Sequence, residues 1–185
     1  MIEISYGIMF VIISVLWCIN RIVVGYHTKR PDWKRELQLL LVYICIVVIV
    51  RFTFCPFEKV DGKIQPLIFD WEKMLPFRIN LIPFVHMVDY AIVREGIINF
   101  VGNTLMFVPV GIVYPIVYKK LDTHKKVIAA GVGFSLVIEI LQLPFYDRVT
   151  DIDDLILNSL GYVLGYFIYL GVKGIKNMNS KRSGI

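Results

Sequence analysis

The sequence predicts an all-α integral membrane protein, a five-span helical bundle with a small extracellular hairpin and an interfacial helix. Hydrophobic residues make up 57% of the 185 residues and charged residues only 19%, and the mean hydropathy is +0.66. An average globular chain is about 45–50% apolar and about 25% charged. The excess apolar residues lie in long runs with few charges, which is typical of transmembrane helices.

Five of these runs are long enough to be candidate spans, since about 17–25 residues cross the hydrocarbon core of a bilayer. They cover roughly residues 4–24, 37–55, 99–118, 127–143 and 155–172. The first run lacks a preceding basic segment and a small-residue cleavage site, so we expect it to be retained rather than removed as a signal peptide. The fourth run is the shortest and contains the ionisable residue Glu139.

The positions of the basic residues predict the orientation of the spans. Twelve of the 20 lysine and arginine residues lie between the first two spans, between the third and fourth, and after the fifth. By the positive-inside rule these segments are cytoplasmic, so the N-terminus is outside and the C-terminus is cytoplasmic. The formal net charge of +5 is then a topological signal, and we expect no nucleic-acid partner.

The one long loop, residues 56–98, is predicted to lie outside. Asp61-Gly62 separates two short segments of alternating polarity, which predicts a β-hairpin with a tight turn. Asp70 is expected to cap a short helical turn. Residues 85–97 place apolar side chains on one side and predict an interfacial helix that leads into the third span.

Polar side chains within apolar spans need a partner or a function, because lipid offers them no hydrogen bonds. They are Asn99 and Asn103 in the third span, Ser135, Glu139 and Gln142 in the fourth, and Asp153, Asp154 and Asn158 in the fifth. All fall near the predicted outer ends, where the loops add Arg78, Asn80, Arg148 and Asp151. The sequence therefore predicts a polar, mostly acidic cluster that opens outward, with no polar path continuing inward.

Small residues and prolines predict how the helices meet around this cluster. Gly161 and Gly165 form a pair of small residues one helical turn apart, which lets a neighbouring helix approach closely. Pro109 is expected to kink the third span, and Pro115 to break it again. A kinked third span against a close-packed fifth span would leave an outward-facing wedge.

Four sequence blocks carry a family resemblance. They are Arg78-Ile79-Asn80-Leu81-Ile82-Pro83-Phe84, Asn103-Thr104-Leu105-Met106-Phe107-Val108-Pro109-Val110-Gly111, Glu139-Ile140-Leu141-Gln142, and Thr150-Asp151-Ile152-Asp153-Asp154 with Asn158-Ser159-Leu160-Gly161. In this order they resemble the motifs of the VanZ-like family of membrane proteins, named for a teicoplanin-resistance protein.

The resemblance covers roughly residues 78–172, which would be a VanZ-like core, and residues 1–55 would add two N-terminal spans. We expect residues 1–185 to form a single membrane domain. The resemblance implies a multi-pass protein of the bacterial plasma membrane that lowers susceptibility to glycopeptide antibiotics such as teicoplanin. Its implied partners are membrane lipid and a lipid-linked cell-wall precursor or a lipoglycopeptide.

Two functions remain open at this point. The protein binds or shields an envelope component, or excludes the drug, through binding residues that would be Arg78, Asn80, Asn103, Gln142, Arg148, Asp151 and Asn158. Alternatively, it is a membrane enzyme that modifies a lipid-linked envelope substrate, with Glu139 and Asp154 as an acid–base or metal pair. A small transporter is less favoured, because the predicted polar cluster does not continue inward.

The candidate residues also have structural alternatives. Glu139 is either a functional carboxylate or a partner of Arg78, Arg148 or an asparagine amide. The carboxylates suit Mg²⁺ or Ca²⁺, which prefer oxygen ligands, or else belong to a solvated loop in which Asp153 or Asp154 caps the fifth span. Arg78 is expected to clamp either a phosphate or the acidic cluster itself. No cofactor is predicted, and the scattered histidines argue against zinc.

Overall fold

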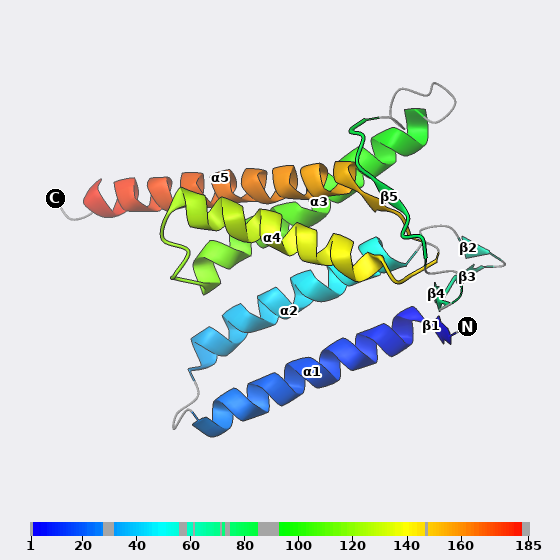
Figure 1. Ribbon diagram of the computed structural model, residues 1–185. Helices are drawn as coiled ribbons and strands as arrows, with labels where there is room; N and C mark the ends of the chain where they lie inside the picture. The colour runs from blue at the N-terminus through cyan, green and yellow to red at the C-terminus, as the bar shows by residue number, and fades with distance from the viewer. Residues whose placement is uncertain are drawn as a thin grey trace. The chain divides into compact units, whose positions relative to one another are not determined.

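The computed structural model describes residues 2–27, 32–55, 59–60, 62–70, 72, 75–84, 93–146 and 148–182. Five helices in these residues are α1 (Tyr6–His27), α2 (Trp33–Phe54), α3 (Val93–Val117), α4 (His124–Gln142) and α5 (Ile152–Arg182) (Figure 1). The short strands there are β1 (Ile2–Ile4), β2 (Lys59–Val60), β3 (Lys63–Ile64), β4 (Leu67–Phe69), β5 (Ile79–Asn80) and β6 (Thr150–Asp151). The predicted helical fold class is confirmed.

Four helices are long and apolar enough to cross a membrane, which makes the chain a multi-pass membrane protein. They are α1, α2, residues Gly96–Val117 of α3, and α5 with Ile152–Lys181. The fourth predicted span forms the 19-residue helix α4, which carries Lys125, Lys126 and Glu139 and is not among these four. The five predicted helices are therefore present, whereas the crossing of the membrane by α4 stays a prediction.

The chain divides into two compact units. Unit 1 comprises Met1–Leu81 and Val137–Ile152, and unit 2 comprises Ile82–Leu136 and Asp153–Ile185. Unit 1 therefore holds α1, α2, the described strands and the C-terminal end of α4. Unit 2 holds α3, the rest of α4 and nearly all of α5.

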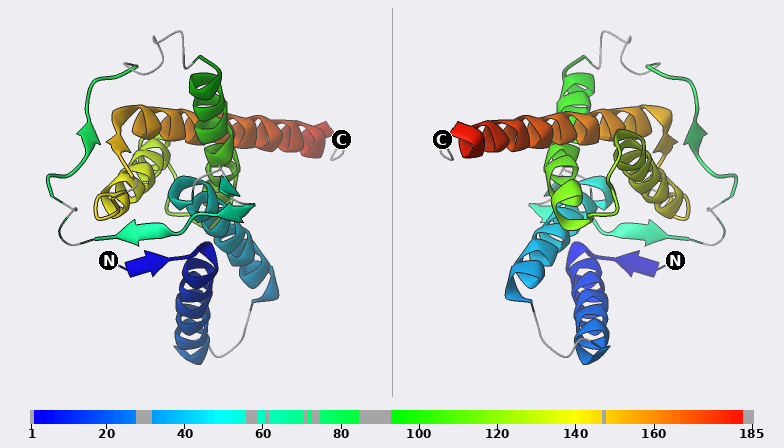
Figure 2. Two further views of the ribbon diagram at one scale, coloured as in Figure 1. Left: turned by 90° about the vertical axis from the view of Figure 1, so that its right-hand side faces the viewer. Right: turned by 90° about the vertical axis from the view of Figure 1, so that its left-hand side faces the viewer.

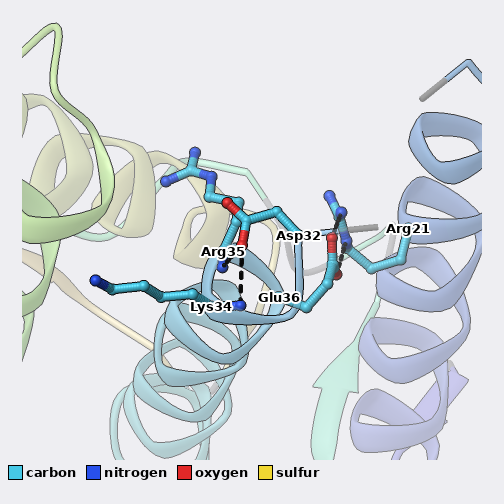
Figure 3. Close-up of polar contacts among 5 residues, drawn as sticks. All are labelled: Arg21, Asp32, Lys34, Arg35 and Glu36. Carbon is cyan, nitrogen blue, oxygen red and sulfur yellow. Dashed lines mark hydrogen bonds and ion pairs between the residues drawn. The ribbon is translucent and has the colours of Figure 1, made fainter. Parts of the chain in front are cut away.

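In unit 1, α1 and α2 form a helical hairpin that polar contacts hold together. The carboxylate of Asp32 accepts hydrogen bonds from the backbone N–H groups of Lys34 (3.1 Å) and Arg35 (3.3 Å) and so caps α2. Beside this cap, Arg21 of α1 binds the Glu36 carboxylate through two guanidinium nitrogens (Figure 3). Within α1, all of which is described, no side chain is buried, so its apolar surface is available to lipid.

The strands of unit 1 organise the long loop between α2 and α3. β1 pairs with β4 in antiparallel register, Ile2 opposite Phe69 (Figure 2). β2 and β3 pair Val60 with Lys63 and enclose Gly62 at φ 74°, which confirms the predicted hairpin. β5 and β6 are parallel, so the segment that follows Arg78 lies beside the segment that leads into α5.

Two other predictions concern the loop between α2 and α3, and the structure tests each of them only in part. The Asp70 carboxylate accepts a hydrogen bond from the Glu72 backbone N–H at 3.1 Å, as expected of a capping residue. The helical turn expected after Asp70 falls partly on residues 71, 73 and 74, which lie outside the described residues. The interfacial helix predicted over 85–97 falls mostly on residues 85–92, which also lie outside them, while 93–97 belong to α3.

In unit 2, α3 crosses α5 (Figure 2), and the two backbones are in contact at the crossing. A Cβ atom at Gly161 would lie 1.9 Å from the carbonyl oxygen of Thr104, and one at Gly165 would lie 2.0 Å from that of Val108. The predicted close approach at these two glycines is confirmed. The expected break at Pro115 is wrong, because α3 continues through Pro109 and Pro115 to Val117.

Aromatic side chains fill the core between the three helices of unit 2. The ring of Tyr162 is fully buried and packs directly against Gly131. A Cβ atom added to Gly131 would lie only 2.3 Å from Cδ1 of this ring. Tyr114 meets the Tyr162 ring edge-on with centroids 5.9 Å apart, and Phe134 packs against Tyr114 and Phe107. Glycines on α4 and α5 thus make room for one tyrosine and for the helix crossing.

A labelling experiment tests the predicted orientation of the chain in the membrane. In intact cells, we expect an impermeant thiol reagent to label Glu72→Cys and to leave Thr123→Cys unlabelled, because the positive-inside rule puts the α3–α4 loop in the cytoplasm. Both positions are exposed. The background carries Cys18→Ser, since Cys18 is exposed whereas Cys45 and Cys55 are buried. The reverse pattern would place the outer loop, and the sites that follow, in the cytoplasm.

Candidate functional site

Unit 1 brings together residues from three of the four motif blocks around Glu139, which we call the Glu139 cluster (Asn80, Glu139, Thr150 and Asp151). Glu139 is 3% exposed, and its Oε2 accepts a hydrogen bond from the Asp151 backbone N–H at 3.2 Å. The Thr150 hydroxyl donates to the Glu139 carbonyl at 2.9 Å. The amide of Asn80 donates to the Asp151 carboxylate at 3.0 Å. The parallel pairing of β5 and β6 is what places these groups side by side.

Gln142 and Arg148, two of the predicted binding residues, contact the end of α2. The Gln142 amide donates to the carbonyl of Thr53 at 2.7 Å, and the Arg148 guanidinium donates to that of Phe54. The last carbonyls of a helix lack partners within the helix and carry partial negative charge. These two side chains therefore cap α2, a structural role that their positions in the sequence did not reveal.

Arg78 takes a different partner from the one the sequence suggests. Its guanidinium carbon lies 4.1 Å from the centroid of the Tyr146 ring, and the side chain is exposed. In the part of the chain that the structure describes, Arg78 forms no ion pair, so the expected contact with Glu139 or Asp151 is wrong, whereas a contact with Asp154, which belongs to unit 2, stays a prediction. The Asn80 amide binds the Asp151 carboxylate and the Asp151 N–H binds the Glu139 carboxylate, and the aromatic face of Tyr146 receives the cation instead.

Tyr146 is the residue of this site that the sequence analysis missed. Its backbone N–H donates to the carbonyl of Ile68 at 3.1 Å, and Phe145 forms a bridge with Phe69. The strand β4 thereby fixes the segment whose ring supports Arg78. The only signal in the sequence was an aromatic pair directly after Pro144, and nothing near it indicated a partner for an arginine 68 positions earlier.

Unit 2 contains a second polar group, the Asp154 cluster (Asn99, Asn103 and Asp154). The Asp154 carboxylate accepts hydrogen bonds from the amides of Asn103 and Asn99, the latter at 3.4 Å. The Asn103 amide also lies 2.8 Å from the Asn99 carbonyl oxygen. The first turn of α5 is thus tied to α3, with the acid at the helix end where the dipole favours negative charge.

Asp153 anchors the end of the first motif block. Both of its carboxylate oxygens accept from the Phe84 backbone N–H, at 2.9 and 3.1 Å, and the side chain is 4% exposed. Phe84 has φ 61°, a left-handed conformation that is rare for a bulky residue. The hydrogen bonds that this carboxylate accepts favour the unusual conformation, so Asp153 anchors the loop.

Asn158 links α5 to α4, and the polar contacts continue beyond it. Its amide donates to the Ser135 hydroxyl at 3.1 Å, and the residue is 1% exposed. Further along α5, the Tyr166 hydroxyl lies 2.8 Å from Nδ1 of His124. The prediction that no polar path continues beyond the cluster is therefore wrong. Tyrosines count as apolar residues in a predicted span, but their hydroxyl groups form hydrogen bonds within it.

The two carboxylates of the predicted acid–base or metal pair belong to different units, Glu139 to unit 1 and Asp154 to unit 2. Each accepts hydrogen bonds from protein amides. Among the described residues, no group of three or more His, Cys, Asp or Glu side chains lies close enough together to hold a metal ion. No geometric observation in these residues therefore supports the predicted option of Mg²⁺ or Ca²⁺.

Known proteins resemble most of this chain. The VanZ/LLP1 family model matches residues 40–174, from within α2 into α5. Protein VanZ of Enterococcus faecium is 33% identical over 104 residues, which cover 56% of this chain. The chain spans 58% of the length of that relative. No solved structure matches.

Proposed function

Since the chain belongs to the VanZ/LLP1 family, we propose that it lowers the susceptibility of a bacterial cell to teicoplanin or a related glycopeptide, acting at the outer face of the plasma membrane. It does so by binding an anionic envelope component and thereby limiting access of the drug to that component. The similarity to Protein VanZ supports the resistance function. The residues that would bind the envelope component are polar residues of unit 1.

The observation that carries this proposal is the state of Arg78. The guanidinium is exposed, is held against the Tyr146 ring, and makes no hydrogen bond within the described residues. A guanidinium that rests on an aromatic ring still presents its N–H groups in a planar fork that matches a phosphate or carboxylate. Arg78 is therefore suited to bind the phosphate of a lipid-linked envelope component.

The Glu139 cluster positions this arginine. The Thr150 backbone N–H donates to the Arg78 carbonyl at 2.9 Å, at the start of the β5–β6 pairing. Glu139 in turn holds the Asp151 N–H and the Thr150 hydroxyl. The chain of hydrogen bonds from α4 through β6 to β5 is what supports Arg78.

We expect Arg78→Ala to remove resistance in a susceptible host. A charge-assisted hydrogen bond contributes about 1.5–3 kcal/mol, so losing it weakens binding by about tenfold or more. Arg78→Lys should restore little, because an ammonium lacks the planar fork. The measurement is the minimal inhibitory concentration of teicoplanin at matched protein amounts. Lys125→Ala removes another exposed cation and is the control; unchanged resistance in Arg78→Ala would overturn the proposal.

Binding and catalysis are separated by a mass measurement. The purified wild-type protein, which contains Arg78, should bind a lipid-linked cell-wall precursor and release it with its mass unchanged. A time-dependent change in the mass of the precursor would instead support the membrane-enzyme alternative. That activity should then be lost in Glu139→Gln and in Asp154→Asn.

A further inference from the structure

A row of polar side chains runs along α5 within unit 2. Its members, Asp154, Asn158, Tyr162 and Tyr166, follow one another at intervals of four residues and so form one ridge of the helix. At about 1.5 Å per residue the row extends about 18 Å, more than half of a hydrocarbon core of about 30 Å. Asn158, Tyr162 and Tyr166 are 1%, 0% and 6% exposed. The row therefore lies inside the protein and not on a lipid-facing surface.

Side chains of α3 and α4 meet this polar row along its length. At one end the Asp154 carboxylate binds the amide of Asn103. In the middle Asn158 donates to Ser135, and Tyr162 lies over Gly131. At the other end the Tyr166 hydroxyl bonds to His124, an exposed residue at the start of α4. Both ends of the row thus carry groups that exchange protons, a carboxylate and an imidazole.

Three buried polar atoms in or beside the row have no hydrogen-bond partner among the described residues. They are Oδ1 of Asn158, the hydroxyl of Tyr162 and, on the adjoining helix α3, Oγ1 of Thr104. A buried polar group without a partner costs about 1–3 kcal/mol. In native proteins such groups are bound to protein atoms or to ordered water, which makes about three hydrogen bonds on average. Two of these atoms belong to successive members of the row.

We propose that water molecules bind along the polar row, complete the hydrogen bonds of Asn158 and Tyr162, and relay protons between Asp154 and His124. A tyrosine hydroxyl is both donor and acceptor, so it passes its own proton to one neighbour while it accepts another from the opposite side. Proton number is conserved at each transfer, and no other reactant is required. This relay uses neither Arg78 nor the envelope ligand, so it stands independently of the proposed resistance function.

The relay is tested with the purified full chain in liposomes that contain a pH-sensitive dye. A potassium gradient with valinomycin makes the interior negative and drives protons inward. We expect proton uptake above that of empty vesicles, and a decrease of about tenfold in Tyr162→Phe and in Asn158→Leu. Tyr169→Phe, which removes a hydroxyl from the same helix outside the row, should leave the rate unchanged.

Thermal unfolding of Tyr162→Phe gives a second readout, because the substitution removes only one hydroxyl from a packed ring. A hydroxyl bound to water contributes favourable hydrogen bonds, so the variant should unfold at a lower temperature than wild type. A hydroxyl buried in a dry core is unfavourable, and its removal would raise that temperature. Wild-type flux equal to that of empty vesicles, or a more stable Tyr162→Phe variant, would overturn the proposal.

Discussion

Replacing Gly161 with alanine is expected to prevent unit 2 from folding. The added Cβ would lie 1.9 Å from the Thr104 carbonyl oxygen and 2.8 Å from its carbonyl carbon, and both atoms belong to the backbone of α3. Backbone cannot move aside as a flexible side chain does, so α3 and α5 would have to separate. Separation would expose the interface around Phe107 and Tyr162, both fully buried. The measurement is the yield and monodispersity of the protein after extraction in detergent.

Gly171→Ala is the matched control on the same helix. A Cβ at Gly171 meets nothing within 4 Å, and alanine is favoured over glycine in a helix by up to about 1 kcal/mol. This variant should accumulate as well as wild type and unfold at the same temperature or slightly above it. If Gly161→Ala behaves like Gly171→Ala, the contact between α3 and α5 at Thr104 is not as close as the structure shows.

The second large effect is expected at Glu139. If the Glu139 carboxylate itself acts on a ligand, as in the membrane-enzyme alternative, Glu139→Gln should remove resistance while the protein still accumulates and resists heating in detergent. The amide oxygen of glutamine can still accept the hydrogen bond from the Asp151 N–H, so the positions of β6 and β5 are kept. What the substitution removes is the negative charge. Teicoplanin susceptibility and unfolding temperature, measured on the same preparations, separate a loss of charge from a loss of structure.

Asp122→Asn controls for the conversion of a carboxylate to an amide. Asp122 is exposed and pairs with Lys126 at 2.8 Å, one turn away. A surface pair of this kind contributes about 0–1 kcal/mol, so both resistance and stability should stay near wild type. If Glu139→Gln loses folded protein together with resistance, Glu139 serves to hold unit 1 together and not to act on a ligand.

The helices could be predicted from the sequence because each depends on a local pattern of residues. Long apolar runs and the Asp61-Gly62 turn correctly indicated five helices and the hairpin of β2 and β3. The spacing of Gly161 and Gly165 correctly indicated a close helix contact. The Arg21–Glu36 pair was not predictable, because each charge lies at the end of an apolar run, where a charged residue is usually exposed to solvent.

The candidate site was predicted in part. Motif residues meet in two groups, Asn80 with Asp151 and Glu139 in unit 1, and Asn103 with Asp154 in unit 2. The partner of Arg78 was not predictable, since several carboxylates and an aromatic ring all attract a guanidinium. The choice depended on the pairing of β5 with β6 and on the bridge that fixes Tyr146.

Local patterns were enough to predict the class of the protein, its helices and the residue types available for chemistry, because hydropathy, turn residues and motif spacing act over a few residues each. Only the tertiary structure decided how those residues are used: Gln142 and Arg148 cap α2, Asp153 anchors Phe84, and Arg78 rests on Tyr146. It also showed that the buried tyrosines of α5 continue the polar contacts to His124. The physical reason is that a polar group binds whichever donor, acceptor or ring the fold brings within about 3–4 Å, and partners distant in the sequence are chosen by packing.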